Sequence, residues 1–181
     1  MSSCATALLL AGCVTPSLHP LVTEETAIFE PALIGKWVDK KDGHTWTFEK
    51  REENAYNLTH AQTEGDTIKF VAALVKLGDN LFLNTIPEEM PADNDLLTPH
   101  LILAYLPLHL QLTDNELNLS GVDNEWLDKA IQQNQISITH QRTAYDTILL
   151  TAPTAELRQF FATHTKTPEA FTELAALRRD Q

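Results

Sequence analysis

The sequence contains little cysteine, little glycine and few basic residues for a chain of 181 amino acids. Its two cysteines, Cys4 and Cys13, both lie within the first thirteen residues. The rest of the chain therefore has no thiol, which excludes a disulfide framework, thiol redox chemistry and thiolate metal ligation there. The six glycines form no glycine-rich loop of the kind that binds phosphate.

Basic residues number 13 against 25 acidic residues, so the formal net charge is −12. Nucleic acids and anionic membrane surfaces both require clustered lysine and arginine, so the composition argues against either partner. The acid excess is concentrated between Lys76 and Lys129, where no basic residue occurs. We expect an acidic surface there, either a solvated face or a docking surface for a basic partner. The acids of this region are Asp79, Glu88, Glu89, Asp93, Asp95, Asp114, Glu116, Asp123, Glu125 and Asp128.

Catalytic and metal-binding motifs are also missing. No two of the seven histidines are four residues apart, and neither a His-Glu-x-x-His nor a Gly-x-Ser-x-Gly motif occurs. His109 and His140 fall on predicted strands, where they are either a pair that meets in space or separate surface histidines. The acids from Glu88 to Asp95 are the one cluster that would suit Ca²⁺, although their spacing matches no EF-hand. We therefore predict a protein that is not an enzyme and has no metal or cofactor.

The first thirteen residues combine an uncharged apolar run with Leu10-Ala11-Gly12-Cys13. The run is too short to span a bilayer as a mature helix, but it is typical of a signal-peptide core. Leu-Ala-Gly-Cys resembles the lipobox of bacterial lipoproteins. The resemblance implies cleavage before Cys13, diacylglycerol on its thiol, and acylation of the new amino terminus with a chain such as palmitate. Because no basic residue precedes the run, the alternatives are a true start further upstream and a buried N-terminal strand or helix.

The lipobox resemblance divides the chain into four parts. We expect a signal peptide at 1–12, a lipidated cysteine and tether at 13–31, a β domain at 32–153 and a helical segment at 154–181. Two prolines and a lack of periodicity in Val14–Leu21 favour an extended spacer. The expected location is the cell envelope, with the lipid in the membrane. The valine after the cysteine resembles outer-membrane sorting, facing the periplasm, in a Gram-negative host.

From Gly35 onward, apolar residues alternate with polar ones more often than they follow a helical period. Such alternation is typical of strands with one buried face, and pairs such as Asp42-Gly43 favour tight turns between them. The predicted strands are 36–40, 44–50, 55–62, 67–77, 80–86, 101–112, 116–122, 136–142 and 147–151. Hairpin-length connections predict an antiparallel meander of eight or nine strands, either a barrel or a strongly curved sheet. The exception is Pro87–Pro99, which we expect to hang over one end as a flap or a disordered loop.

Three helices are predicted within this mainly β fold. One is inserted at 124–134, with Asp123 as its N-cap. A second spans 154–165, and a third begins at Pro168, so that two helices end the chain. The apolar side of the third consists of Phe171, Leu174 and Leu177.

Gly35-Lys36-Trp37 opens the first predicted strand. It resembles the Gly-x-Trp signature of lipocalins and related calycins. In that family the tryptophan packs across the closed end of an eight-stranded barrel, and the glycine allows close backbone approach. An arginine near the end of the last strand packs over the tryptophan. The last predicted strand contains no arginine, which leaves Arg142 and Arg158 as the nearest candidates.

The mature chain also resembles a group of uncharacterised bacterial lipoproteins. The resemblance lies in the runs Thr45–Lys50 and Leu150–Leu157, and it implies no known activity.

Two functions fit these observations. The first is a lipid-anchored interaction module without enzymatic activity, whose acidic surface contacts another envelope protein. The alternative is a lipocalin-like protein that binds an apolar small molecule, such as a fatty acid or lipid. An open cavity of a few hundred Å³ would favour the alternative, and a filled barrel would favour the module. The expected barrel-interior residues are Phe70, Leu74, Leu81, Leu83 and Leu108.

Overall fold

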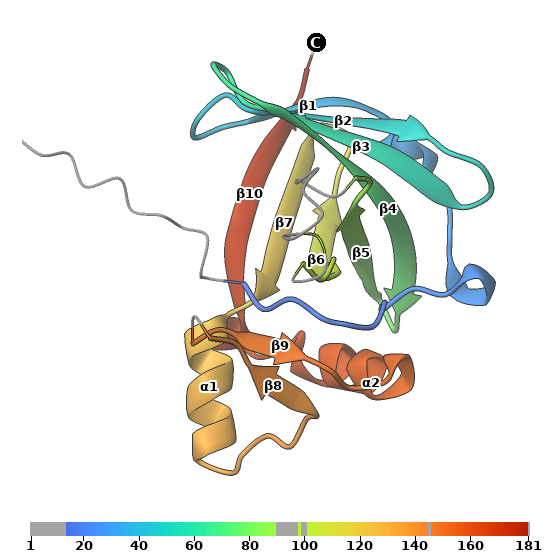
Figure 1. Cartoon of the computed structure of the whole chain (residues 1–181). Coiled ribbons are helices and arrows are strands. Elements are labelled where there is room, and N and C mark those ends of the chain that lie inside the picture. The colour runs from blue at the N-terminus through green and yellow to red at the C-terminus, as the bar shows by residue number, and fades with distance from the viewer. Residues whose placement is uncertain (1–13, 90–97, 99–100, 145, 181) are drawn as a thin grey trace, which may run out of the picture.

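The computed structural model of the chain describes residues 14–89, 98, 101–144 and 146–180. Eight strands form a closed antiparallel barrel in the order β1-β10-β7-β6-β5-β4-β3-β2 (Figure 1). The predicted mainly β fold is confirmed, and the sheet closes. The barrel strands are β1 (Gly35–Asp39), β2 (Thr45–Lys50), β3 (Ala55–Ala61), β4 (Thr67–Leu77), β5 (Asn80–Pro87), β6 (Leu106–Leu112), β7 (Glu116–Val122) and β10 (Phe171–Arg179).

Alternation along each strand decides which side chains fill the barrel. On β3, for example, Tyr56 and Leu58 are buried while Asn57 between them is only half-buried. Removing these apolar side chains from water stabilises the closed sheet. The buried part of the barrel core consists of Leu33, Trp37, Phe48, Tyr56, Leu58, Ala72, Leu74, Leu83, Leu108, Leu110, Leu117, Leu119, Ala175 and Leu177.

The segment predicted as a third helix is the eighth barrel strand, so that prediction is wrong. The cap-and-proline start produces only the 3-10 helix η5 (Pro168–Ala170), and β10 follows at once. Residues 171–179 are rich in helix-favouring types, but as a strand they pair with β7 and, at Leu177–Arg179, with β1. These pairings close the barrel and override the local propensity. A β-bulge between Glu173 and Ala175 interrupts the period of two that would have marked the strand.

The predicted strands at 136–142 and 147–151 lie outside the barrel. They contribute a separate two-stranded sheet of β8 (His140–Arg142) and β9 (Ile148–Leu150). The cause is the helix α1 (Asn124–Gln132), which follows β7 and leads the chain away from the barrel before either strand forms. The place beside β7 is then taken by β10.

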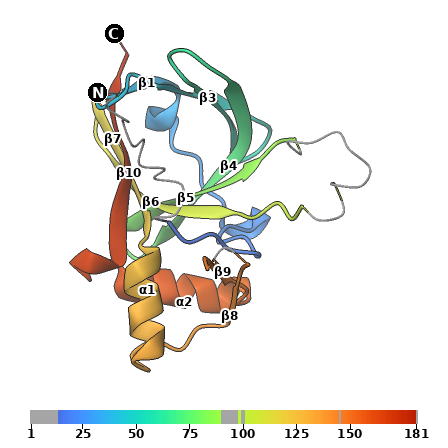
Figure 2. The same cartoon turned by 60° about the vertical axis from the view of Figure 1, so that its left-hand side comes forward.

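The two helices pack below the barrel wall (Figure 2). Asp123 caps α1 as predicted, because its side chain accepts a hydrogen bond from the Trp126 amide at 2.8 Å. The predicted second helix is α2 (Thr154–His164). A second core lies between the helices, the small sheet and the outer faces of β4 and β5. Its buried members are Leu21, Val22, Val75, Phe82, Val122, Leu127, Ile138, Ile148, Leu150, Ala152, Leu157, Phe160 and Phe161.

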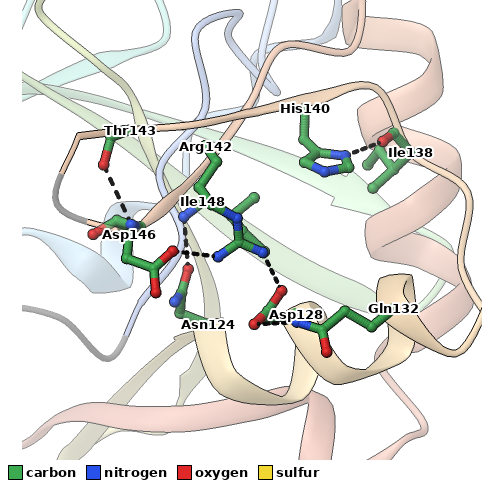
Figure 3. Close-up of polar contacts among 10 residues, drawn as sticks. Asn124, Asp128, Gln132, Ile138, His140, Arg142, Thr143, Asp146 and Ile148 are labelled. Carbon is green, nitrogen blue, oxygen red and sulfur yellow. Dashed lines mark hydrogen bonds and ion pairs between the residues drawn. The ribbon is translucent and has the colours of Figure 1, made fainter.

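The β8–β9 hairpin is joined to α1 by ion pairs around Arg142 (Figure 3). The Arg142 guanidinium donates to Asp128 on α1 and, at 2.8 Å, to Asp146. Gln132 donates to the other Asp128 oxygen at 2.9 Å. The hydrogen bond from Arg142 lowers the pKa of the Asp128 carboxyl group. Because this cluster is open to solvent, we regard it as a structural contact of small net stabilising effect.

The predicted tether at 13–31 is packed into the fold from residue 14 onward. Leu21 is fully buried in the second core. Its amide donates to the side chain of Asn84 at 2.5 Å, and Arg158 on α2 donates to its carbonyl at 2.8 Å. The segment is largely extended, as its prolines indicate, but burial of its apolar side chains fixes it in place. Two 3-10 helices follow, η2 (Glu24–Thr26) and η3 (Pro31–Leu33).

Candidate ligand-binding site

One end of the barrel is closed around Trp37, which is fully buried. Its indole nitrogen donates to the Leu33 carbonyl at 3.0 Å, and the Arg179 guanidinium carbon lies 4.2 Å from the centre of its ring. Gly35 has a φ of +126°, and a Cβ there would lie 3.1 Å from an Arg179 nitrogen, so the position favours glycine. Arg179 also donates to the carbonyls of Ala32, Ile34 and Asp114. We call this the closed end.

The arginine over Trp37 is neither of the two candidates from the sequence. Arg142 pairs with Asp128 on α1 and with Asp146, and Arg158 donates a hydrogen bond to the Leu21 carbonyl in the N-terminal segment. Arg179 takes this place because β10, rather than the strand at 147–151, is the last strand of the barrel. The resemblance to lipocalins calls for an arginine near the end of that strand, and Arg179 is its final residue.

The other end of the barrel contains a cavity of about 300 Å³, which we call the cavity end. Its lining is apolar toward the barrel core and polar on one side. The apolar lining residues are Trp46, Leu58, Phe70, Leu106, Leu108 and Leu174. The polar lining residues are Asp39, Asp42, His44, His60 and Thr85. Leu174, at the bulge of β10, is 39% exposed, so part of the apolar lining meets solvent.

All five residues expected in the barrel interior belong to its core. Phe70 and Leu108 line the cavity. Leu74 and Leu83 are fully buried in the core, and Leu81 is partly buried against it. The interior is therefore filled by side chains over part of its length and hollow at the cavity end.

The polar lining residues were missed by sequence reasoning. Asp39, His60 and Thr85 each lie two residues after a buried, inward-facing residue of the same strand. Those buried residues are Trp37, Leu58 and Leu83. Because side chains alternate along a strand, all three polar residues occupy inward positions of β1, β3 and β5. The signal is a polar residue at an inward, otherwise apolar position of a strand, but only the pairing of the strands shows that the three line one cavity.

The turn between β1 and β2 holds the two carboxylates in place. An Asp39 oxygen accepts a hydrogen bond from the Lys41 amide at 2.7 Å. One Asp42 oxygen accepts from the His44 amide at 2.9 Å, and the other lies 3.1 Å from the His44 ring nitrogen Nδ1. Each carboxylate thus has a fixed orientation through its own turn.

Three rings lie next to one another at the same side of the cavity. The His60 ring centre is 5.5 Å from that of His44 and 5.0 Å from that of Trp46, both in edge-to-face geometry. Burial and the nearby His44 ring lower the pKa of His60 below its ordinary value. His60 is therefore neutral at pH 7 and contributes an aromatic surface and hydrogen-bonding nitrogens.

The other histidines of interest do not form a site. The His109 ring lies 3.2 Å from an Asn80 oxygen and packs beside Phe82 on the outer face of the barrel. The His140 ring nitrogen is 2.8 Å from the Ile138 carbonyl in the small sheet. Within the described residues, no group of three or more His, Cys, Asp or Glu side chains is arranged to hold a metal ion.

The acids between Lys76 and Lys129 are distributed over several elements. Asp93 and Asp95 lie outside the described residues, as does Cys13. The others lie at the β4–β5 turn, at the end of β5, on the β6–β7 hairpin and around α1. Four of them form ion pairs, namely Glu88 with Arg51, Glu116 with Lys40, Glu125 with Lys129, and Asp128 with Arg142. The expected acidic surface is thus partly neutralised by basic residues from outside the region.

No family model matches the chain, and neither does any curated protein or solved structure. In the part of the chain that is described, no helix has the length and apolar character needed to cross a membrane. The fold and the site together define a small closed β-barrel with one filled end and one hollow end.

Proposed function

We propose that the protein binds a small, largely apolar ligand in the cavity at one end of its barrel. The observation that carries this proposal is the cavity of about 300 Å³ with its apolar lining and a few convergent polar groups. Sites for small molecules have volumes of roughly 300–1,000 Å³ and this composition. The interior of an eight-stranded barrel is just wide enough either to be filled by side chains or to hold one small ligand, and here part of it is not filled.

The closed end supports the same proposal. Gly35, Trp37 and Arg179 have the arrangement that the resemblance to lipocalins calls for, so we place the chain, as part of the proposal, among lipocalin-like binding proteins. The interaction module draws less support, because several acids on which it depends are paired with basic residues.

Replacing Leu106 with tryptophan tests the proposed binding. Leu106 is an inward residue of β6 that lines the cavity, so a tryptophan there would fill much of the space. The affinity of the uncharged fluorophore N-phenylnaphthylamine, read from its fluorescence on titration, is expected to fall at least tenfold. Native mass spectrometry of the protein from its own membrane would show whether a copurified small molecule is lost as well.

Leu112 provides the matched control, because it is an inward leucine of the same strand near its other end. Leu112→Trp imposes similar overpacking, which typically costs about 1–3 kcal/mol, but leaves the cavity open. It should keep the wild-type affinity. Equal affinities of all three proteins, or no binding by the wild type, would contradict the proposal.

We also propose that the protein is anchored in the cell envelope by lipid on Cys13. The support is the apolar run that ends in Leu-Ala-Gly-Cys. Cys13→Ser is expected to remove palmitate labelling and to move the protein from the membrane to the soluble fraction. Cys4→Ser is the matched control, since Cys4 would leave with the signal peptide. Unlabelled wild-type protein, or membrane-bound Cys13→Ser, would argue against a lipid anchor.

A further inference from the structure

The polar part of the cavity lining has a charge character of its own. Among the described residues that line the cavity, the ionisable ones are two carboxylates and two imidazoles, without lysine or arginine. Lys40, next to the same turn, extends toward Glu116, with its ammonium nitrogen 2.7 Å from a carboxylate oxygen. Burial keeps His60 neutral at pH 7 through its lowered pKa. The electrostatic potential in the cavity is therefore expected to be negative.

The two carboxylates are placed where a bound molecule would meet them. Asp39 occupies an inward position of β1, and Asp42 lies in the turn that follows. Each carboxylate accepts a hydrogen bond from a backbone amide of that turn, which fixes its position, and the second Asp42 oxygen also lies 3.1 Å from the His44 ring nitrogen Nδ1. Trp46 lines the cavity beside them, and tryptophan is the side chain that best attracts a cation to its face.

We propose that the natural ligand is an amphiphile with a cationic ammonium head and a short apolar tail. This inference rests on the proposed binding function and makes the ligand class specific. The tail would contact Leu58, Phe70 and Leu108, while the head would lie near Asp39, Asp42 and Trp46. A fatty acid has the same tail, but its carboxylate would be repelled by the two like charges that line the same cavity. We therefore expect the cavity to bind a fatty acid, the ligand suggested by the resemblance to lipocalins, less tightly than a cationic amphiphile.

Three probes that share a ten-carbon chain but differ in the charge of the head group test which head group the cavity prefers. The dissociation constants of decyltrimethylammonium, decanol and decanoate are measured at pH 7.5 by displacement of N-phenylnaphthylamine. The two ionic probes are kept below their micelle concentrations and decanol below its solubility limit. We expect the cation to bind at least tenfold more tightly than decanoate, with decanol between them. The preference should shrink as sodium chloride is raised, because salt screens charges that are open to solvent.

The double variant Asp39→Asn with Asp42→Asn removes the two charges. Asparagine retains an oxygen that can accept the same amide hydrogen bonds, so the turn is expected to keep its shape. The cation and decanoate should then bind within about threefold of each other. Asp79→Asn with Asp114→Asn is the charge-matched control, because both acids are exposed in turns away from the cavity. This control should keep the wild-type preference.

The outcomes separate this inference from the function on which it rests. If none of the three probes displaces the fluorophore from the wild type, the binding function itself fails. If decanol binds but decanoate matches or exceeds the cation, the binding function stands and the cationic ligand class is wrong. That ranking is read on the wild-type protein, so the inference is tested even if the double variant does not fold. A preference that persists in a folded double variant would also overturn it.

Discussion

Replacing Leu21 with alanine is expected to lower the free energy of unfolding by about 2–5 kcal/mol. Leu21 is fully buried in the second core, and the backbone on both sides of its side chain is hydrogen-bonded to β5 and α2. The truncation would leave a hole between the barrel wall and the helix. Denaturant unfolding followed by circular dichroism measures the loss. A residue of a free spacer would show no such effect.

His19 provides the control within the same segment. Its side chain is exposed, so His19→Ala should change the free energy of unfolding by less than about 0.5 kcal/mol. Equal, small effects of both substitutions would mean that the segment is the loose tether expected from its prolines. A large loss for Leu21 alone would show that it belongs to the folded domain.

Truncating Trp37 to alanine is expected to destabilise the protein by about 3–5 kcal/mol, the range typical of large aromatic side chains in a core. The substitution removes the buried ring at the closed end, together with its hydrogen bond to the Leu33 carbonyl and its contact with Arg179. Thermal and denaturant unfolding would both report the loss.

A double-mutant cycle with Arg179→Met isolates the contact between guanidinium and ring. A coupling free energy of about 0.5–2 kcal/mol is expected, since this is the range of cation–π pairs from exposed to desolvated sites. Methionine keeps much of the apolar stem, so the cycle reports the charged group over the ring. Additive effects of the two substitutions would mean that the ring and the arginine stabilise the closed end independently.

The seven barrel strands that the sequence predicts share a local signal, although the one predicted at 101–112 begins only at Leu106. Their apolar residues alternate within one strand, and the turns beside them contain glycine, aspartate or asparagine, so each hairpin can be predicted without the rest of the chain. The eighth strand has no such signal. Residues 171–179 favour a helix locally, and they become a strand because β1 and β7 each leave one edge to be paired. These two edges lie on either side of one gap only after the other seven strands have paired with one another.

The candidate site was hidden for a similar reason. Asp39, His60 and Thr85 are ordinary residues in three separate stretches of sequence, and nothing local connects them. They line one cavity only because β1, β2 and β3 pair and β4 joins β3 to β5. The apolar interior is easier to predict, because residues two apart on a strand point to the same face, so the apolar face of each strand can be identified before its partners are known.

In a lipid-anchored form of the protein, the packed N-terminal segment would limit how far the barrel can lie from the membrane. As a free chain, residues 14–31 would let the barrel move up to about 60 Å from the bilayer. Because residues 14–31 are packed against the domain, they add almost nothing to the distance between barrel and bilayer. A lipid on Cys13 would be attached one residue before Val14. Val14 packs against Gly121, at a point where Leu108 of the cavity lining is also close. The barrel would then stay at a nearly constant distance from the membrane and in a narrow range of orientations, with its cavity end beside the lipid anchor.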